Sequence, residues 1–163
     1  MIHAIQIPAD EQRPLYKVTL NNLESMQSAV GGLIEFMDID RPEASLICNE
    51  EGKLLGLPMN RRATLLLWVH LTRWRGHDAL AGDVLIVGRP NDKGDTQNVP
   101  QELVDLLFNT KRFKYEVTTY DSLETWSGNQ RRYDDWVTAY NDGLALASRW
   151  FAVNDVRVVP AED

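Results

Sequence analysis

The stretch ASLICNEEGKLLGLPMNRRA at residues 44–63 carries the signals that decide the fold. Its first part, residues 44–50, is apolar and suits a buried strand. Glu51-Gly52 then predicts a tight turn, because glycine adopts the positive φ that a bulged three-residue loop needs. Residues 53–58 would return as the second strand of a hairpin, and their proline would end the pairing because it has no N–H.

A helix is predicted directly after this hairpin. Asn60 is a good N-cap residue, and RRATLLLWVHLTRWRG follows it. Gly76 is a stop signal, so the helix is predicted over residues 61–75. Leucines lie around much of its circumference, and such a helix is either central in the fold or partly covered by a partner.

The remaining elements follow from the periodicity of apolar residues. Strands are predicted at residues 16–21, 33–39, 80–90, 113–121 and 153–160. Helices are predicted at residues 23–31, 99–109 and 133–152. Loops are predicted at residues 91–98 and 122–132, the second of which could include a short helical turn.

This order of elements predicts an α+β fold with a mainly antiparallel sheet and packed helices. Residues 1–110 would form one domain, and residues 111–163 would form a C-terminal β–α–β extension. The joint between them is predicted at residues 110–112. The extension could add strands to the first sheet or fold beside it.

The composition is that of an acidic globular protein. The chain has 163 residues, of which 44% are hydrophobic and 25% are charged, so it can bury a core. Its formal net charge of −7 argues against general nucleic-acid binding, which needs a basic surface. An acidic surface could instead imitate DNA, and a local basic patch could still contact nucleic acid.

The sequence also argues against several kinds of site and location. The single cysteine, Cys48, excludes an internal disulfide framework and a cysteine-based zinc site. His70 lies among apolar residues and is expected to be a core or boundary residue instead of a metal ligand. The histidines have no other His or Cys partner close in sequence, so no metal is expected, and no cofactor is expected either. The N-terminus has no secretory signal and no apolar run can cross a bilayer. We therefore expect a soluble, cytoplasmic protein without membrane contact.

The arginines that open the predicted helix are a candidate anion site. Positive side chains at a helix N-terminus oppose the helix dipole, whereas the free N–H groups there favour an anion. Asn60, Arg61 and Arg62 would hold a phosphate or carboxylate, with Asn49 and Lys53 of the hairpin within reach. The alternative is a surface ion pair between an arginine and a glutamate of the turn, which would contribute little stability.

Aromatic residues are concentrated in the C-terminal part of the chain. Trp126, Tyr133 and Trp136 are close in sequence, and Arg131 and Arg132 lie between them. They predict either a compact core for a small unit or a surface on which a base could stack. No GxSxG, P-loop, HExxH or Rossmann glycine motif is present, so no catalytic residue is nominated.

The hairpin ICNEEGKLLGLPMNRRA and the later strand LAGDVLIVG together resemble a small uncharacterised domain family of phages, prophages and conjugative elements. The hairpin signature of that family reads CNEEGKL-x-GLP-x-N-R. Its second pattern is filled here by Asp78, Leu80, Gly82, Val84, Val87 and Gly88. The resemblance covers about residues 15–110. It implies an accessory protein of a mobile element, among antirestriction and other host-conflict proteins, and it supplies no catalytic residues.

Three functional hypotheses follow. The first is a non-enzymatic accessory protein of a phage or mobile element that binds a host bacterial protein, in counter-defence or host takeover. The second is a protein that binds or sequesters a nucleotide or another anion through the arginines and aromatic residues. The third is nucleic-acid binding or DNA mimicry. The sequence predicts no oligomeric state.

Overall fold

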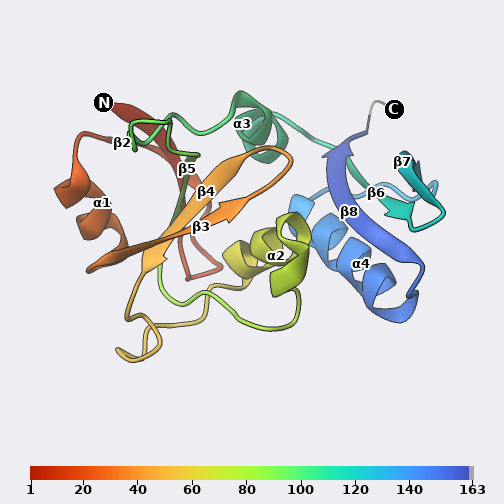
Figure 1. Cartoon of the computed structure of the whole chain (residues 1–163), viewed down its shortest axis with the longest axis horizontal. Coiled ribbons are helices and arrows are strands. Elements are labelled where there is room, and N and C mark those ends of the chain that lie inside the picture. The colour runs from red at the N-terminus through yellow and green to blue at the C-terminus, as the bar shows by residue number, and fades with distance from the viewer. Residues whose placement is uncertain (162–163) are drawn as a thin grey trace.

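The chain folds into two antiparallel sheets that lie side by side, and some of its helices lie between them (Figure 1). The computed structural model describes residues 1–161. The first sheet has the strand order β2-β1-β5-β4-β3. Its strands are β1 (Ile2–Ile7), β2 (Tyr16–Leu20), β3 (Ile34–Ile39), β4 (Ala44–Asn49) and β5 (Val84–Gly88).

The second sheet has the order β7-β6-β8 and is also antiparallel. Its strands are β6 (Phe113–Thr119), β7 (Ser122–Gly128) and β8 (Val153–Pro160). Helix α4 (Trp136–Arg149) packs against β6 and β8. Helix α3 (Gln101–Phe108) lies in the segment that connects the two sheets.

A central helix joins the two sheets. Helix α2 (Arg61–His70) packs against α4 and β8, and seven of its ten residues are buried. One apolar core therefore runs from Ile86 in the first sheet through Leu66 of α2 to Tyr140 and Val156 beside the second. A smaller core lies on the opposite face of the first sheet, beneath α1 (Leu23–Val30). The leucine-rich helix is thus central in the fold.

The predicted fold class is confirmed, because the structure combines helices with two antiparallel sheets. The C-terminal segment folds beside the first sheet and does not extend it. It contains one more strand than the predicted β–α–β unit. This strand is β7, and most of its side chains are exposed. Such a strand lacks the alternation of buried and exposed residues that identifies strands in a sequence.

The return strand predicted at residues 53–58 is wrong. Strand β4 lies between β3 and β5 and is paired on both edges. A hairpin partner would need one of those edges, so the chain has no position for it. Residues 50–59 instead leave β4 through consecutive turns and project away from the sheet (Figure 1).

The N-terminal strand and the end of α2 also differ from the prediction. Residues 2–7 form β1 between β2 and β5, where no strand is predicted, and its second half is buried on both faces. Helix α2 ends before the predicted residue 75, because Leu71 leaves the helical conformation at φ −140°. A 3-10 turn, η1 (Thr72–Trp74), follows it.

The side chain of Asn60 connects three segments at the start of α2. Its Oδ1 accepts the N–H of Ala63 at 3.0 Å and caps the helix. Its Nδ2 donates to the carbonyl oxygens of Ile7 at 2.9 Å and Gly82 at 3.0 Å. Asn60 is fully buried, so water cannot replace these partners.

We expect the Asn60→Ala variant to lose about 2–4 kcal/mol of unfolding free energy. Removing the side chain leaves one buried N–H and two buried carbonyl groups without these partners, in addition to the lost cap. Urea unfolding of the purified variant measures the loss.

Asn22→Ala is the matched control, because Asn22 is exposed and caps helix α1 by accepting the N–H of Ser25. Its loss should be about 1 kcal/mol, the ordinary value of a cap. Equal losses at the two positions would show that the inward hydrogen bonds of Asn60 contribute nothing beyond capping.

Candidate functional site

The five residues predicted to bind an anion have separate surroundings. Asn60 is buried at the helix cap, as described above. Asn49 is also buried: its Nδ2 donates to the carbonyl of Val30 at 3.2 Å, and its Oδ1 accepts the N–H of Glu51 at 2.8 Å. Both asparagines therefore hold the backbone together and are turned away from solvent.

The two arginines point in different directions. Arg62 is buried and donates from Nη2 to the carbonyl oxygens of Pro8 at 2.7 Å and Asp10 at 3.1 Å. Burial lowers the pKa of its guanidinium below the ordinary value. Arg61 is exposed and forms an ion pair with Glu11 at 3.4 Å. The arginines thus bind the segment after β1 and do not pair with the glutamates of the turn.

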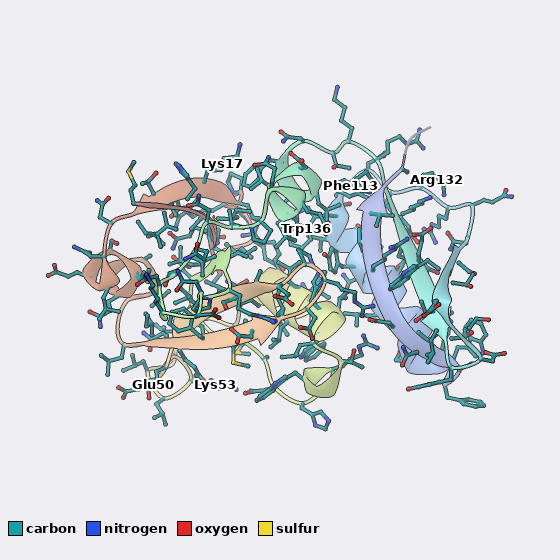
Figure 2. All side chains as sticks on the ribbon, turned by 45° about the horizontal axis from the view of Figure 1, so that its top comes forward. Lys17, Glu50, Lys53, Phe113, Arg132 and Trp136 are labelled. Carbon is teal, nitrogen blue, oxygen red and sulfur yellow. The ribbon has the colours of Figure 1, made fainter. Side chains whose placement is uncertain are left out.

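The fifth residue, Lys53, is exposed on the projecting loop, the name we use for residues 50–59, and forms an ion pair with Asp78. Figure 2 shows Lys53 and Glu50 on this loop, far from Trp136. The predicted anion residues and the predicted aromatic residues therefore do not form one site.

The aromatic residues divide between the core and the surface. Tyr133 is buried, and its hydroxyl donates to Asp142 Oδ2 at 2.7 Å. Trp136 is buried with its ring edge-to-face against Tyr140, at a centroid distance of 5.6 Å. These two residues build the core of the C-terminal unit. Trp126 is half-buried and lies on β7.

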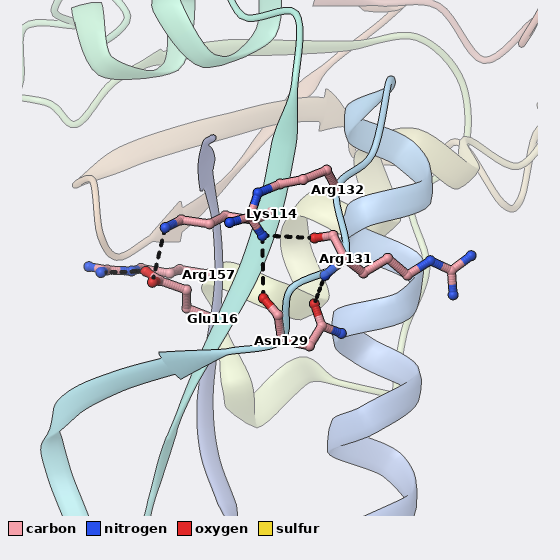
Figure 3. A network of polar contacts seen from close by, with 6 residues as sticks. All are labelled: Lys114, Glu116, Asn129, Arg131, Arg132 and Arg157. Carbon is pink, nitrogen blue, oxygen red and sulfur yellow. Dashed lines mark hydrogen bonds and ion pairs between the residues drawn. The ribbon is translucent and has the colours of Figure 1, made fainter. Parts of the chain in front are cut away.

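Charged side chains from both sheets already surround Trp126. The guanidinium of Arg157 lies 4.2 Å from the Trp126 ring centroid, and that of Arg41 lies 5.4 Å away. Arg157 also donates to Oε1 of Glu116 from Nε at 2.9 Å and from Nη2 at 2.6 Å (Figure 3). Lys114 approaches the second oxygen of Glu116 at 3.7 Å. The exposed part of Trp126 therefore belongs to a charged, internally paired surface.

A cleft of about 720 Å³ lies between the two sheets. Its walls come from the β3–β4 turn, the end of α2, α3, Trp126 and the edge of β8. Its apolar lining includes Val69, Leu103, Leu106 and Val158. No local pattern in the sequence indicated this cleft, because its walls come from distant segments.

His70 lies at the base of the cleft and shares a hydrogen bond of 2.7 Å between its Nε2 and the Tyr140 hydroxyl. Burial lowers the pKa of His70 to about 4, although hydrogen bonds to the backbone of Asp40 and Arg41 partly oppose the shift. Burial also raises the pKa of the Tyr140 hydroxyl well above its ordinary value. The pair is therefore neutral at pH 7.

The projecting loop exposes large apolar side chains. Leu54 is 86% exposed, Leu55 59% and Met59 50%. They lie within one short segment of the chain. Below the loop, Cys48 lines a smaller pocket, and burial raises the pKa of its thiol to about 11.

Backbone hydrogen bonds hold the loop in this conformation. The N–H of Leu57 donates to Gly52 at 2.9 Å, and the N–H of Leu55 donates to Glu51 at 2.9 Å. At the far end, the N–H of Gly82 donates to Pro58 at 2.7 Å. A Cβ on Gly52 would lie 3.0 Å from the Ala81 carbonyl oxygen, so a side chain there would crowd the base of the loop. The exposed leucines are thus presented by an ordered backbone.

Within residues 1–161, no three His, Cys, Asp or Glu side chains gather in a way that could hold a metal ion. No helix in this part of the chain has the length and apolar character needed to cross a bilayer.

The shifted pKa of His70 predicts a pH-dependent stability. As the pH falls below about 6.5, the unfolded chain takes up a proton on His70 while the folded chain does not, down to about pH 4. The contribution of His70 to the unfolding free energy is therefore fully present above about pH 6.5 and is lost progressively as the pH falls toward 4. Between about pH 7.5 and about pH 5 the expected loss is about 2 kcal/mol.

Urea unfolding at the two pH values checks this expectation. His70→Gln should unfold with a weaker pH dependence than the native chain. His77→Gln, which changes an exposed histidine, should keep the native dependence. The same pH dependence in all three proteins would contradict the shift.

Comparison with protein families gives one match. A family model described as Domain of unknown function (DUF3846) matches residues 3–113. Because the match covers more than half of the chain, the chain belongs to that family. The matched segment extends from β1 to the first residue of β6. No curated protein and no solved structure matches the chain.

Proposed function

We propose that this member of the DUF3846 family is a non-enzymatic accessory protein of a phage or mobile element that binds a host bacterial protein. The observation that carries the proposal is the ordered projecting loop with Leu54, Leu55 and Met59 exposed. Clustered apolar side chains on a surface commonly mark protein interfaces. The resemblance to proteins of phages and conjugative elements supports a host protein as the partner.

The projecting loop is suited to hold a partner protein, because its exposed leucines lie on an ordered backbone. Burying a leucine side chain in a partner is worth roughly 1.5–3 kcal/mol. Ordering a flexible loop would offset part of that gain, but this loop is already held by its own backbone hydrogen bonds and by the ion pair of Lys53 with Asp78. Leu54 and Leu55 are therefore the expected centre of the interface.

Charge indicates the chemistry of the partner. Glu50 and Glu51 are exposed at the base of the loop, and Glu35 is exposed on the neighbouring strand. The loop's lysine is already paired with Asp78. The expected partner surface is an apolar pocket flanked by lysine or arginine side chains, and association should slow as salt is added.

The hypothesis of a nucleotide or other anion at the helix start has less structural support. Arg62 is turned inward onto backbone carbonyl groups, and Asn49 and Asn60 are buried. Arg61 is the exposed cation at that helix end, and it is paired with Glu11.

The leucines of the loop are tested by paired substitutions in a pull-down from bacterial lysate. We expect a protein that the native chain retains to be lost when Leu54→Ser and Leu55→Ser are combined. Thermal stability should stay near the native value, because both side chains are exposed.

Leu23→Ser combined with Leu123→Ser is the matched control, since both leucines are 56% exposed and lie away from the loop. The control should retain the same protein as the native chain. Recovery of an identical set of proteins by the loop variant and the native chain would refute the loop as the binding surface.

A further inference from the structure

Three aromatic side chains are exposed at one end of the second sheet. Phe151 is 93% exposed, Tyr120 65% and Trp150 45%. Trp150 and Phe151 belong to the turn that leads from α4 into β8, and Tyr120 belongs to the turn between β6 and β7. We call these three residues the aromatic tip. It lies at the far end of the molecule from the projecting loop (Figure 1).

Backbone hydrogen bonds bring the two turns of the aromatic tip together. The N–H of Tyr120 donates to the carbonyl of Ala152 at 3.1 Å. The N–H of Val153 donates to the carbonyl of Trp150, also at 3.1 Å. Thr119 is paired with Val153 in the antiparallel ladder of β6 and β8. The residues of the tip are therefore neighbours on an ordered backbone, although Tyr120 is distant from the other two in sequence.

The aromatic tip is large enough to be an interaction surface. Aromatic side chains carry about 150–250 Å² each, so the exposed parts of these three present roughly 400 Å². Exposed apolar patches of about 300–600 Å² are often functional in soluble proteins. Covering the tip would remove this apolar surface from water, which favours association.

Two charges of opposite sign flank the aromatic tip. Arg149 precedes Trp150 at the end of α4, and Asp121 follows Tyr120 in the turn before β7. Both charged side chains are exposed, and neither forms an ion pair with another side chain in the described part of the chain, residues 1–161. The tip is thus positive on its α4 side and negative on its β7 side. A partner that matches the tip must present the same two charges in the opposite order.

A second copy of the chain presents the charges in that order when a two-fold axis relates it to the first copy. Both copies then use the same surface, as in most homodimers. The aromatic tips would face each other, and Arg149 of each copy would approach Asp121 of the other. One symmetric contact would therefore cover both tips and pair all four charges.

The size of this contact indicates a weak dimer. With the flanking residues included, two copies would bury on the order of 1,000 Å² in total, which is at the low end for specific interfaces. The net charge of −7 on each copy also opposes association. The expected dimer is therefore reversible and forms at micromolar or higher concentration.

We propose that the aromatic tip is a self-association surface through which two copies of this chain form a symmetric dimer. Because the tip and the projecting loop lie at opposite ends of the molecule, both loops stay exposed in the dimer. The dimer would thus offer a host protein two binding surfaces instead of one, which raises the overall affinity when both can be engaged.

Sedimentation of the purified native chain from low micromolar to near-millimolar concentration tests the proposal first. We expect the average mass to rise from that of a monomer toward that of a dimer and not beyond it, because a two-fold contact is closed. A monomer at every concentration, or growth to larger species, would overturn the proposal. Only the purified chain is present, so the result does not depend on whether a host protein binds the projecting loop.

The location of the contact is tested with Phe151→Ser. This variant should dimerise at least about tenfold more weakly, because the most exposed apolar side chain of the tip is lost. The matched control is Leu54→Ser combined with Leu55→Ser, which also removes exposed apolar side chains but at the projecting loop. It should dimerise like the native chain. A dimer that survives Phe151→Ser, or one that is lost in the loop variant, would refute the aromatic tip as the contact.

The two-fold arrangement is tested by reversing the charges in separate proteins. Asp121→Arg gives a tip with two positive charges, and Arg149→Asp gives a tip with two negative charges. Each variant alone should dimerise roughly fivefold or more weakly, because like charges then meet at both ends of the symmetric contact.

Mixing the two charge variants supplies the decisive comparison. Opposite charges then meet at both ends of the contact between unlike copies, so the equimolar mixture should dimerise nearly as well as the native chain. Mixing cannot repair a folding defect, so restored association is specific to the paired charges. A mixture that associates no more strongly than its separate components would overturn the proposal.

Discussion

The buried carboxamide of Asn60 is the constraint on which the rest of the architecture depends. It fixes the start of α2 against the end of β1 and the approach to β5 at the same time. Because α2 then continues between the two sheets, its starting position sets where the second sheet can pack. The same residue closes the projecting loop, through the hydrogen bond from its N–H to Leu80 at 2.8 Å. The positions of the core, the projecting loop and the cleft therefore all depend on Asn60.

The signals that predicted the fold correctly were local ones. Asn60 as a cap, the apolar run of β5 and the alternation in β6 depend on neighbouring residues only. The hairpin at residues 53–58 failed for a non-local reason, because β4 is paired on both sides by strands that precede it or follow much later. Strand β1 is similar in part: one of its two partners, β5, lies far along the chain.

The candidate sites also combine features that the local sequence indicates with features that only the folded chain creates. Arg61 and Arg62 break the rule for charges at a helix start, and the sequence identified them as unusual. It could not show that Pro8 and Asp10 supply the acceptors for Arg62, because the segment after β1 reaches α2 only in the folded chain. The cleft requires residues from several elements, and no pattern within one segment encodes it. The exposed leucines were visible in the sequence, but they were assigned to a strand.

The position of Cys48 has a practical consequence. It is the single thiol of the chain, it is 5% exposed, and it lies in the pocket under the projecting loop. With its pKa raised to about 11, it is mostly protonated at neutral pH and reacts slowly with alkylating reagents. Modification therefore requires β4 or the loop to open first. The rate of thiol labelling measures how often this part of the molecule opens, and a partner that seals the loop would slow it.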